Sequence, residues 1–117
     1  MIRLEFPKPL PSVNTFWSSP HWSRRSRHAR AWHDLAAVVV AEAGHPVAAC
    51  PVGAVVTCYN VRGMDASNVC YKPLEDGLVK AGVLPDDSPE YVAWVKVESV
   101  RVRKKAEQRT VVELVSA

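Results

Sequence analysis

The chain has 117 residues, which suits a single domain, and we expect one domain over residues 1–117. Hydrophobic residues make up 48% of the sequence and charged residues 23%, a balance typical of a soluble globular protein rather than of a disordered chain. Fifteen Lys and Arg residues against twelve Asp and Glu residues give a net charge of +3, which by itself only weakly favours a polyanionic partner.

The cysteines and the apolar stretches indicate the compartment. Cys50, Cys58 and Cys70 are too widely spaced for a paired zinc motif, and their odd number favours free thiols in a reducing environment. Residues 47–59, the most apolar stretch, are shorter than a bilayer span and are interrupted by a proline and a glycine. The first residues carry charge and proline where a signal peptide would be apolar. We therefore predict a soluble, cytoplasmic protein without membrane association.

The first half of the chain predicts a strand, a loop and a basic helix. Residues 2–6 alternate between apolar and charged side chains, as in a half-buried strand, and the prolines that follow end it. Residues 10–23 are rich in Pro, Ser and aromatic side chains and predict a loop. Residues 26–43 repeat apolar side chains at helical spacing, and Gly44 followed by Pro46 stops this helix.

The second half predicts three more strands and a second helix. Residues 52–61 are apolar on both faces, which is typical of a central strand covered on both sides. Residues 73–81 predict a helix that ends at Gly82. Residues 91–103 predict a strand with a bulge near Glu98-Ser99, and residues 110–115 a last strand in a hairpin with it. The predicted fold class is a compact α+β domain of order β-α-β-α-β-β, with two helices packed on a mixed sheet.

The stretch that carries chemistry is residues 65–87, an acidic loop, a short helix, a glycine stop and a second acidic loop. Hard cations such as Mg²⁺ prefer oxygen ligands and usually take one or two protein carboxylates each. A metal ion held this way can activate water and stabilise the leaving oxygen of a phosphodiester, and a lysine can neutralise charge on the phosphate. We expect Mg²⁺, with Mn²⁺ as an alternative, beside Lys72, with the acids Asp65, Glu75, Asp76, Asp86 and Asp87 available around it.

The same residues also have a purely structural interpretation. The Asp86-Asp87 pair suits a simple turn, and Asp65 suits a residue that caps a loop. The series Lys72, Asp76 and Lys80, four residues apart, is typical of a solvated helix face. Spacing alone leaves this alternative open.

Geometry adds a constraint, because the helix separates the two acidic loops. With about 9–13 helical residues between them, Asp65 and Asp87 start roughly 14–20 Å apart, whereas a magnesium ion with its ligands spans only about 4 Å. Either the loop after Gly82 folds back along the helix, or a second subunit supplies the missing acid. We predict a homodimer in which Asp65 of one chain meets Asp87 of the other.

The acidic stretch resembles the signature of the RusA-type Holliday junction resolvases, which runs Asp-x-Asp-Asn, a lysine, a helical Asp-x-Leu, Ala-Gly and a paired Asp-Asp. The chain supplies, in that order, Asp65, Asn68, Lys72, Asp76-Gly77-Leu78, Ala81-Gly82 and Asp86-Asp87. Its Pro11-Ser12-Val13-Asn14 is similar to the Pro-x-x-Asn opening of the family, and arginines follow it as they do there.

The resemblance implies the small RusA fold and Mg²⁺-dependent nicking of four-way DNA junctions by a homodimer, in recombination and repair of phage or prophage DNA, with no nucleotide cofactor. Carried over by position, Asp65, Asp87 and Lys72 are the catalytic residues. Asp65 and Asp87 are metal ligands, Asp86 is their neighbour, and Lys72 faces the phosphate. Asp76 is the residue that can complete the metal set.

Two departures from the pattern matter. Ser67 stands where the family has its second Asp, so the site has one negative charge fewer, and the step from Asn68 to Lys72 is one residue longer than expected. The protein is then either an active variant with a relaxed metal set or a junction-binding protein that has lost catalysis. A third possibility is an unrelated interaction module whose acidic loop binds a protein.

Basic side chains next to the motif predict the DNA contacts. Arginines that neutralise phosphates give salt-dependent binding with little sequence preference, and Trp17 and Trp22 either stack on opened bases or pack their loop onto the core. The predicted DNA-binding residues are Asn14, Arg24, Arg25, Arg27, Arg30, Asn68, Lys104 and Lys105.

Overall fold

A computed structural model describes residues 1–14 and 22–117 of the chain, and for residues 22–25 it describes the backbone alone. Along the chain the elements are β1 (Ile2–Phe6), α2 (Trp22–Glu42), β2 (Val52–Asn60), η1 (Ala66–Asn68), α3 (Lys72–Lys80), β3 (Val92–Arg101), η2 (Lys105–Glu107) and β4 (Arg109–Ser116). The elements η1 and η2 are single turns of 3₁₀ helix. The predicted order of strands and helices is confirmed, although α2 begins four residues earlier than expected.

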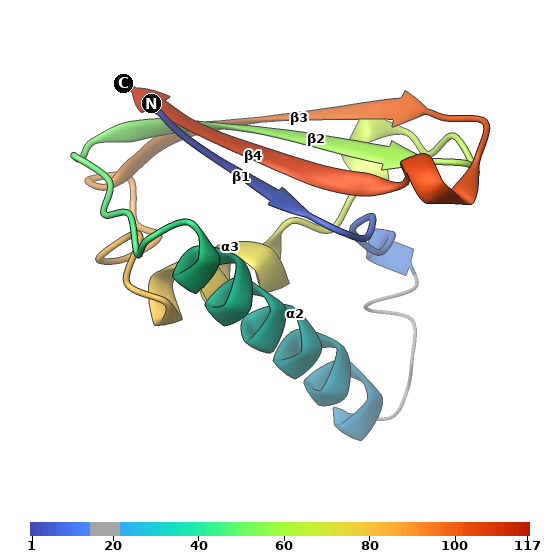
Figure 1. Cartoon of the computed structure of the whole chain (residues 1–117), viewed down its shortest axis with the longest axis horizontal. Helices are drawn as coiled ribbons and strands as arrows, with labels where there is room; N and C mark the ends of the chain where they lie inside the picture. Colours follow the sequence, from blue (N-terminus) through green and yellow to red (C-terminus); the bar gives the residue numbers. More distant parts are fainter. Residues whose placement is uncertain (15–21) are drawn as a thin grey trace.

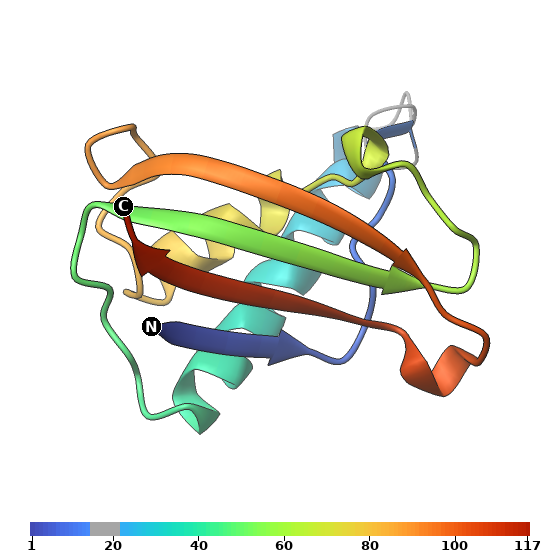
Figure 2. The same cartoon turned by 90° about the horizontal axis from the view of Figure 1, so that it is seen from above.

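The strands form one mixed sheet in the order β1-β4-β2-β3. β2 and β3 run parallel, whereas β4 lies antiparallel to both β1 and β2. Helices α2 and α3 pack on the same face of this sheet, and the termini lie close together at one end of it (Figure 1). Seen from above, α2 crosses beneath the strands at an angle (Figure 2). The predicted fold class, two helices on a mixed sheet in a compact α+β domain, is confirmed.

The predicted hairpin between the last two strands is wrong. β4 does not pair with β3, because β2 lies between them and takes β4 on one side and β3 on the other. The turn η2 carries the chain across the end of β2 instead. Pairing of this kind depends on contacts between residues far apart in sequence, which the alternation within each strand does not specify.

The predicted bulge near Glu98-Ser99 is also in the wrong place. Thr57 and Cys58 of β2 pair with these two residues in unbroken register, and the irregularity falls at Val52 and Gly53, where β3 begins. Along β3 the valines switch from one face of the strand to the other. This is tolerated because β3 is an edge strand whose side chains are largely exposed on both faces, so neither face has to be apolar throughout.

The core lies between the sheet and the helices, and alternation in the strands supplies its sheet side. Leu4 and Phe6 of β1 and Val112 and Leu114 of β4 are buried there. β2 contributes its own alternate residues, and α2 and α3 cover the layer with Trp32, Ala36, Val40, Leu74 and Leu78. The helices touch closely at Gly77, where an added Cβ would lie 2.9 Å from Cβ of Ala36. This glycine lets α3 approach α2.

β2 is the predicted central strand, largely buried and lying between β4 and β3, and its second face is covered by side chains rather than by another layer. The Trp94 ring lies against Gly53, so closely that a Cβ on this glycine would be 2.0 Å from it. The guanidinium of Arg109 stacks 3.9 Å above the ring centre of Tyr59. Long side chains of the neighbouring strands thus explain why β2 is apolar on both faces.

Two other sequence expectations can be compared with the structure. Cys50, Cys58 and Cys70 are all free, as predicted, and the last two are buried. None of the helices in the described parts of the chain is long and apolar enough to cross a membrane.

Candidate functional site

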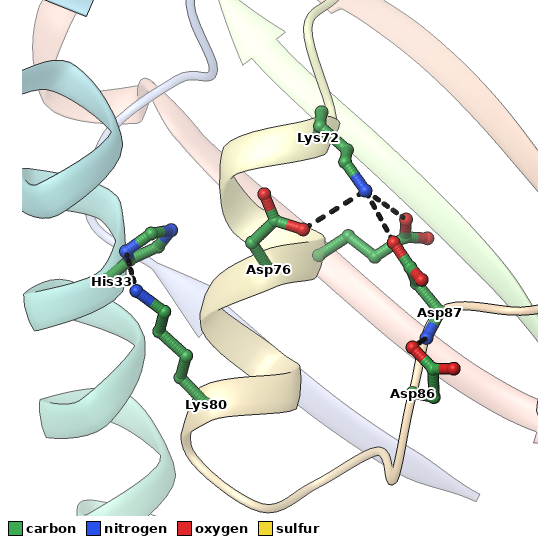
Figure 3. Close-up of polar contacts among 7 residues, drawn as sticks. His33, Lys72, Asp76, Lys80, Asp86 and Asp87 are labelled. Atoms are coloured by element: carbon green, nitrogen blue, oxygen red, sulfur yellow. Dashed lines mark hydrogen bonds and ion pairs between the residues drawn. The ribbon is translucent and has the colours of Figure 1, made fainter. Parts of the chain in front are cut away.

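The loop after α3 folds back along the helix. Gly82 has φ +85°, which turns the chain, and Val83 N then donates to the carbonyl of Leu78 at 3.0 Å. Val83 and Leu84 are buried in the core, and the Val83 carbonyl accepts a bond from Ala48 N at 2.9 Å. These anchors carry the next residues up the side of α3, so that Asp86 and Asp87 lie beside the helix (Figure 3).

Lys72, the first residue of α3, gathers carboxylates around its ammonium group. Its Nζ lies 2.5 Å from Oδ2 of Asp87 and 3.1 Å from Oδ1 of Asp76, one helical turn later. Oε1 of Glu75 lies at 4.0 Å on the next face of the helix. Figure 3 shows Asp76 and Asp87 approaching this nitrogen from the helix and from the returning loop. Residues 15 positions apart in sequence are thereby brought into one charged cluster.

The charged groups in this cluster shift one another's pKa values. The bond from Lys72 holds the pKa of Asp87 below its ordinary value, and the same bond, together with Asp76, raises the pKa of Lys72 despite partial burial. Glu75 behaves differently, because burial raises the pKa of its carboxyl more than the nearby ammonium lowers it. Lys72 and Asp87 are therefore both charged at neutral pH and form an ion pair.

Asp86 orients its neighbour rather than Lys72. Its Oδ1 accepts a 2.8 Å bond from the backbone N–H of Asp87, the short-range geometry of an aspartate in a turn. The Asp86 side chain is exposed. Asp86 and Asp87 thus form a turn, and the same turn lies beside the cluster. Asp86 fixes the backbone from which Asp87 reaches Lys72.

Asp65 lies at the start of η1, outside this cluster. Its side chain is exposed, does not cap the turn, and forms no hydrogen bond or ion pair with the described residues. Gly63, with φ +62°, turns the chain from the end of β2 towards Asp65, and Ser67 is exposed on the same turn. The sequence correctly placed Asp65 just beyond a core strand, but the structure does not bring it into the contacts made by Lys72.

The two segments that carry the family resemblance lie against each other. Ser12 forms an isolated antiparallel bridge with Val69, and Cys70 N donates to the carbonyl of Pro11 at 2.9 Å. The Pro11–Asn14 segment is therefore joined to the chain directly after η1. This pairing places Asn14 and Asn68 on adjacent segments, although 54 positions separate them in the sequence.

The carboxylates fit a hard cation in kind. Within the described residues no three His, Cys, Asp or Glu side chains are grouped so that they could hold a metal ion as they stand. However, oxygens of Asp76, Asp87 and Glu75 already lie within 4.0 Å of one positive group, the ammonium of Lys72. The ammonium of Lys72 thus occupies the position among these acids that a metal ion would need, and a metal ion would have to displace it.

The predicted DNA-binding side chains are spread over the molecule. Arg27 and Arg30 are exposed on α2, Lys104 and Lys105 are exposed at η2, and Asn14 is exposed beyond β1. Asn68 is partly buried at the end of η1. Trp17 and the side chains of Trp22, Arg24 and Arg25 fall outside the described part of the structure.

Two residues to which the sequence assigned no role, Glu75 and His33, belong to the surroundings of the site. Glu75 lies three residues after Lys72, a spacing that makes helix neighbours and was available as a signal. His33 of α2 contacts the next turn of α3, with its Nδ1 3.1 Å from Nζ of Lys80 (Figure 3). Burial and Lys80 lower the pKa of His33. Nothing in the sequence indicated this contact between helices.

The returning loop bears on the predicted dimer. Of the two geometric alternatives, the chain adopts the first, since Asp87 reaches the beginning of α3 within one molecule. A second subunit is therefore not needed to bring Asp87 to the start of α3. Only Asp65, which lies outside the Lys72 contacts, still leaves that argument open. A homodimer remains a prediction that follows from the resemblance.

No protein-family model matches the chain, and no curated protein matches it. The resemblance to the RusA-type resolvases therefore rests on the residues quoted above and on their arrangement.

Proposed function

We propose that the protein is a Mg²⁺-dependent, structure-selective endonuclease that nicks four-way DNA junctions as a cytoplasmic homodimer. One observation carries the proposal: a single cationic nitrogen is surrounded by carboxylates that come from a helix and from the loop folded back along it. Groups whose pKa values are shifted by a specific charge partner cluster at functional sites, and here Lys72 and Asp87 shift each other. The order of these residues along the chain, which matches the resolvase motif, supports the same assignment.

The residues would divide the work as follows. Asp76 and Asp87 would hold the metal ion, with Asp65 and Asp86 completing its ligands directly or through water. When bound, Mg²⁺ supplies an activated water and stabilises charge on the phosphate oxygens. Lys72, displaced from the acids by the metal, would turn its ammonium to the phosphate, where it offsets the negative charge that develops. The exposed Arg27, Arg30, Lys104 and Lys105 would bind the flanking phosphates.

A second candidate function is a junction-binding protein with weakened catalysis. Two observations favour it. Ser67 offers a neutral oxygen where the resemblance calls for a carboxylate, and Lys72 already neutralises the remaining acids. A metal ion would then compete poorly with the internal ammonium, whereas binding to DNA phosphates by the basic side chains would be unaffected.

Binding and nicking of a labelled four-way junction separate these candidates. We expect the junction to bind in preference to a linear duplex of the same sequence, and to be nicked when Mg²⁺ or Mn²⁺ is added. Asp65→Asn and Asp87→Asn should each abolish nicking and leave junction binding largely intact. Binding without nicking under either metal would support the weakened-catalysis candidate. Absence of junction preference would overturn both and favour a protein-binding module.

The same preparations test the assembly. Light scattering should report twice the monomer mass, because two symmetry-related nicks in a four-way junction call for two symmetry-related sites. A monomer mass with and without Mg²⁺, and also with junction DNA, would contradict the homodimer.

A further inference from the structure

A hollow in the described part of the structure lies next to Asp65 and is not used by the proposed cleavage chemistry. It has a volume of about 470 Å³, within the range of small-ligand sites. Met64 and Asn68, which lie on either side of Asp65 in the chain, both line it. The hollow thus adjoins the acidic loop, on the turn that carries Asp65.

Two side-chain amides on the polar wall of this hollow are held in one orientation. Oδ1 of Asn60 accepts a 3.0 Å bond from Arg62 N, and Oε1 of Gln108 accepts a 3.2 Å bond from Val61 N. A backbone N–H fixes each amide oxygen, so the NH₂ group is the end left for a ligand. Neither NH₂ group has a partner among the described residues.

The other lining residues narrow the class of ligand. Arg62 is exposed at the hollow and is only a hydrogen-bond donor, so the polar wall offers mainly donors and calls for a ligand with acceptors. Pro9 and Pro11 supply rigid apolar rings on the other side. A phosphate would find a single cation here and an apolar wall that cannot hydrogen-bond to it. A flat ring with carbonyl or ring-nitrogen acceptors on its edge matches both walls.

We propose that this hollow binds the acceptor-bearing edge of an unpaired nucleobase, with the NH₂ groups of Asn60 and Gln108 as donors. As a biological role this rests on the proposed function: the base would belong to a nucleotide next to the cleaved phosphate, whose metal ion Asp65 would help to hold. Bases at the centre of a four-way junction are more easily unstacked than those in a duplex, so moving one into the hollow costs less there. The hollow would then help to select branched DNA and to fix the position of the cut strand.

Thymidine is a suitable probe, because it carries two carbonyl acceptors and no phosphate. We expect titration with thymidine, without metal and observed by ¹H–¹⁵N NMR, to shift the side-chain amide signals of Asn60 and Gln108 and the backbone signals of Val61 and Arg62. Inorganic phosphate at the same concentration should not shift them. Shifts that are absent, that lie elsewhere, or that phosphate reproduces would overturn the proposal.

Two isosteric variants sharpen the test. Gln108→Glu and Asn60→Asp keep the oxygen that accepts the backbone bond but replace the NH₂ donor with a second acceptor. Each should weaken thymidine binding by about fivefold or more, the effect expected for one lost base contact. Ala106→Glu, on exposed η2 outside the hollow, adds the same charge and should bind like the wild type. Equal binding by all four proteins would contradict the assignment.

The outcome is separable from that of the nuclease proposal. Thymidine contains no scissile bond and the titration contains no metal, so binding can succeed even if junctions are never nicked. Nicking of junctions together with no thymidine contact at Asn60 and Gln108 would remove only the base site. The NMR spectra also report directly whether each variant is folded.

Discussion

The Nζ atom of Lys72 lies 2.5 Å from Oδ2 of Asp87 and thereby ties the first residue of α3 to the loop that follows the helix. This contact makes Lys72 both a structural and a chemical residue. It closes the loop against the helix, and it occupies the position among carboxylates where a metal ion would bind. A metal ion and the ammonium therefore compete for the same acids.

Removal of the Lys72 charge should expose this competition. Lys72→Met keeps the length of the side chain but leaves Asp76, Asp87 and Glu75 to repel one another, so we expect a lower Tm without metal. These ion pairs are exposed to solvent, which screens them, so the loss should be modest. Mg²⁺ should restore the variant's Tm and affect the wild type much less. The control Lys72→Arg keeps the charge, and an equal Mg²⁺ response in all three proteins would contradict competition.

The contact also predicts how stability depends on pH. The pKa of Asp87 is lowered on folding, so its ion pair stabilises the fold above the unfolded pKa of about 3.9 and is lost as pH falls through the folded value. The pKa of Lys72 is raised, so the pair persists until the solution becomes strongly alkaline. The difference in Tm between wild type and Asp87→Asn should be constant around neutral pH and should vanish in acid. Asp87 is one of the charges that raise the pKa of Glu75, so Glu75 contributes to this difference until both carboxyls are protonated.

A difference that grows on acidification would mean that Asp87 is not stabilised as a carboxylate. Thermal unfolding followed by circular dichroism across the acid range measures it directly. Asp86→Asn is the control for the ion pair itself, because Asp86 bonds to the backbone N–H of Asp87 and not to Lys72. Asp86 also helps to lower the pKa of Asp87, so this variant should change the difference less than Asp87→Asn does and should not abolish it.

The close contact between the helices gives a test of how the site is positioned. Gly77→Ala would place a methyl group 2.9 Å from Cβ of Ala36 and push α3 away from α2. Overpacking costs about 1–3 kcal/mol, and the better helix propensity of alanine offsets about 1 kcal/mol of that. We therefore expect a net loss of stability of up to about 2 kcal/mol in denaturant titrations. The same substitution should cost less in an Ala36→Gly background, and an equal cost in both would show that the helices do not touch there.

Features that depend on residues close together in the sequence could be predicted, whereas features that depend on contacts between distant residues could not. The alternation of Ile2, Leu4 and Phe6 and the helical spacing of Leu74 and Leu78 are local, and both elements form as predicted. The strand order is not local. β4 lies between β1 and β2, and the sequence of β4 alone does not indicate which strands it will pair with.

The site divides in the same way. The motif order put Lys72 and Asp87 in one site, and the structure brings the two side chains into contact. The spacing along the helix did not decide whether a returning loop or a second subunit would close the site. The signal that could have resolved this was the pair Val83 and Leu84: two apolar residues directly after a glycine stop have to be buried, and burying them turns the chain back beside α3. His33 had no comparable signal, because its contact depends on how two helices pack.

The outer face of the sheet provides a prediction that does not depend on function. Gly53→Ala would place a methyl group 2.0 Å from the Trp94 ring, so the ring has to move. We expect a loss of about 1–3 kcal/mol and a change in tryptophan fluorescence. In a Trp94→Ala background the same substitution should be neutral or stabilising, since alanine is favoured over glycine within a strand. A cost that persists without Trp94 would place its origin in the backbone instead.

Ser67 offers the sharpest test of whether catalysis is present, weakened or lost. Ser67→Asp adds a carboxylate on the turn that carries Asp65, at the position where the resemblance calls for one, and divalent ions bind more tightly as the number of charged ligands rises. Ser67 is exposed, so stability should change by no more than about 0.5 kcal/mol. We expect half-maximal junction nicking at a markedly lower Mg²⁺ concentration, or the appearance of nicking if the wild type has none. The control Ser67→Asn has a similar shape without the charge and should behave like the wild type. If Ser67→Asn matched Ser67→Asp, or if neither variant altered the metal requirement, residue 67 would lie too far from the metal ion to bind it. The acids beside Lys72 would then have to bind the ion without help from η1.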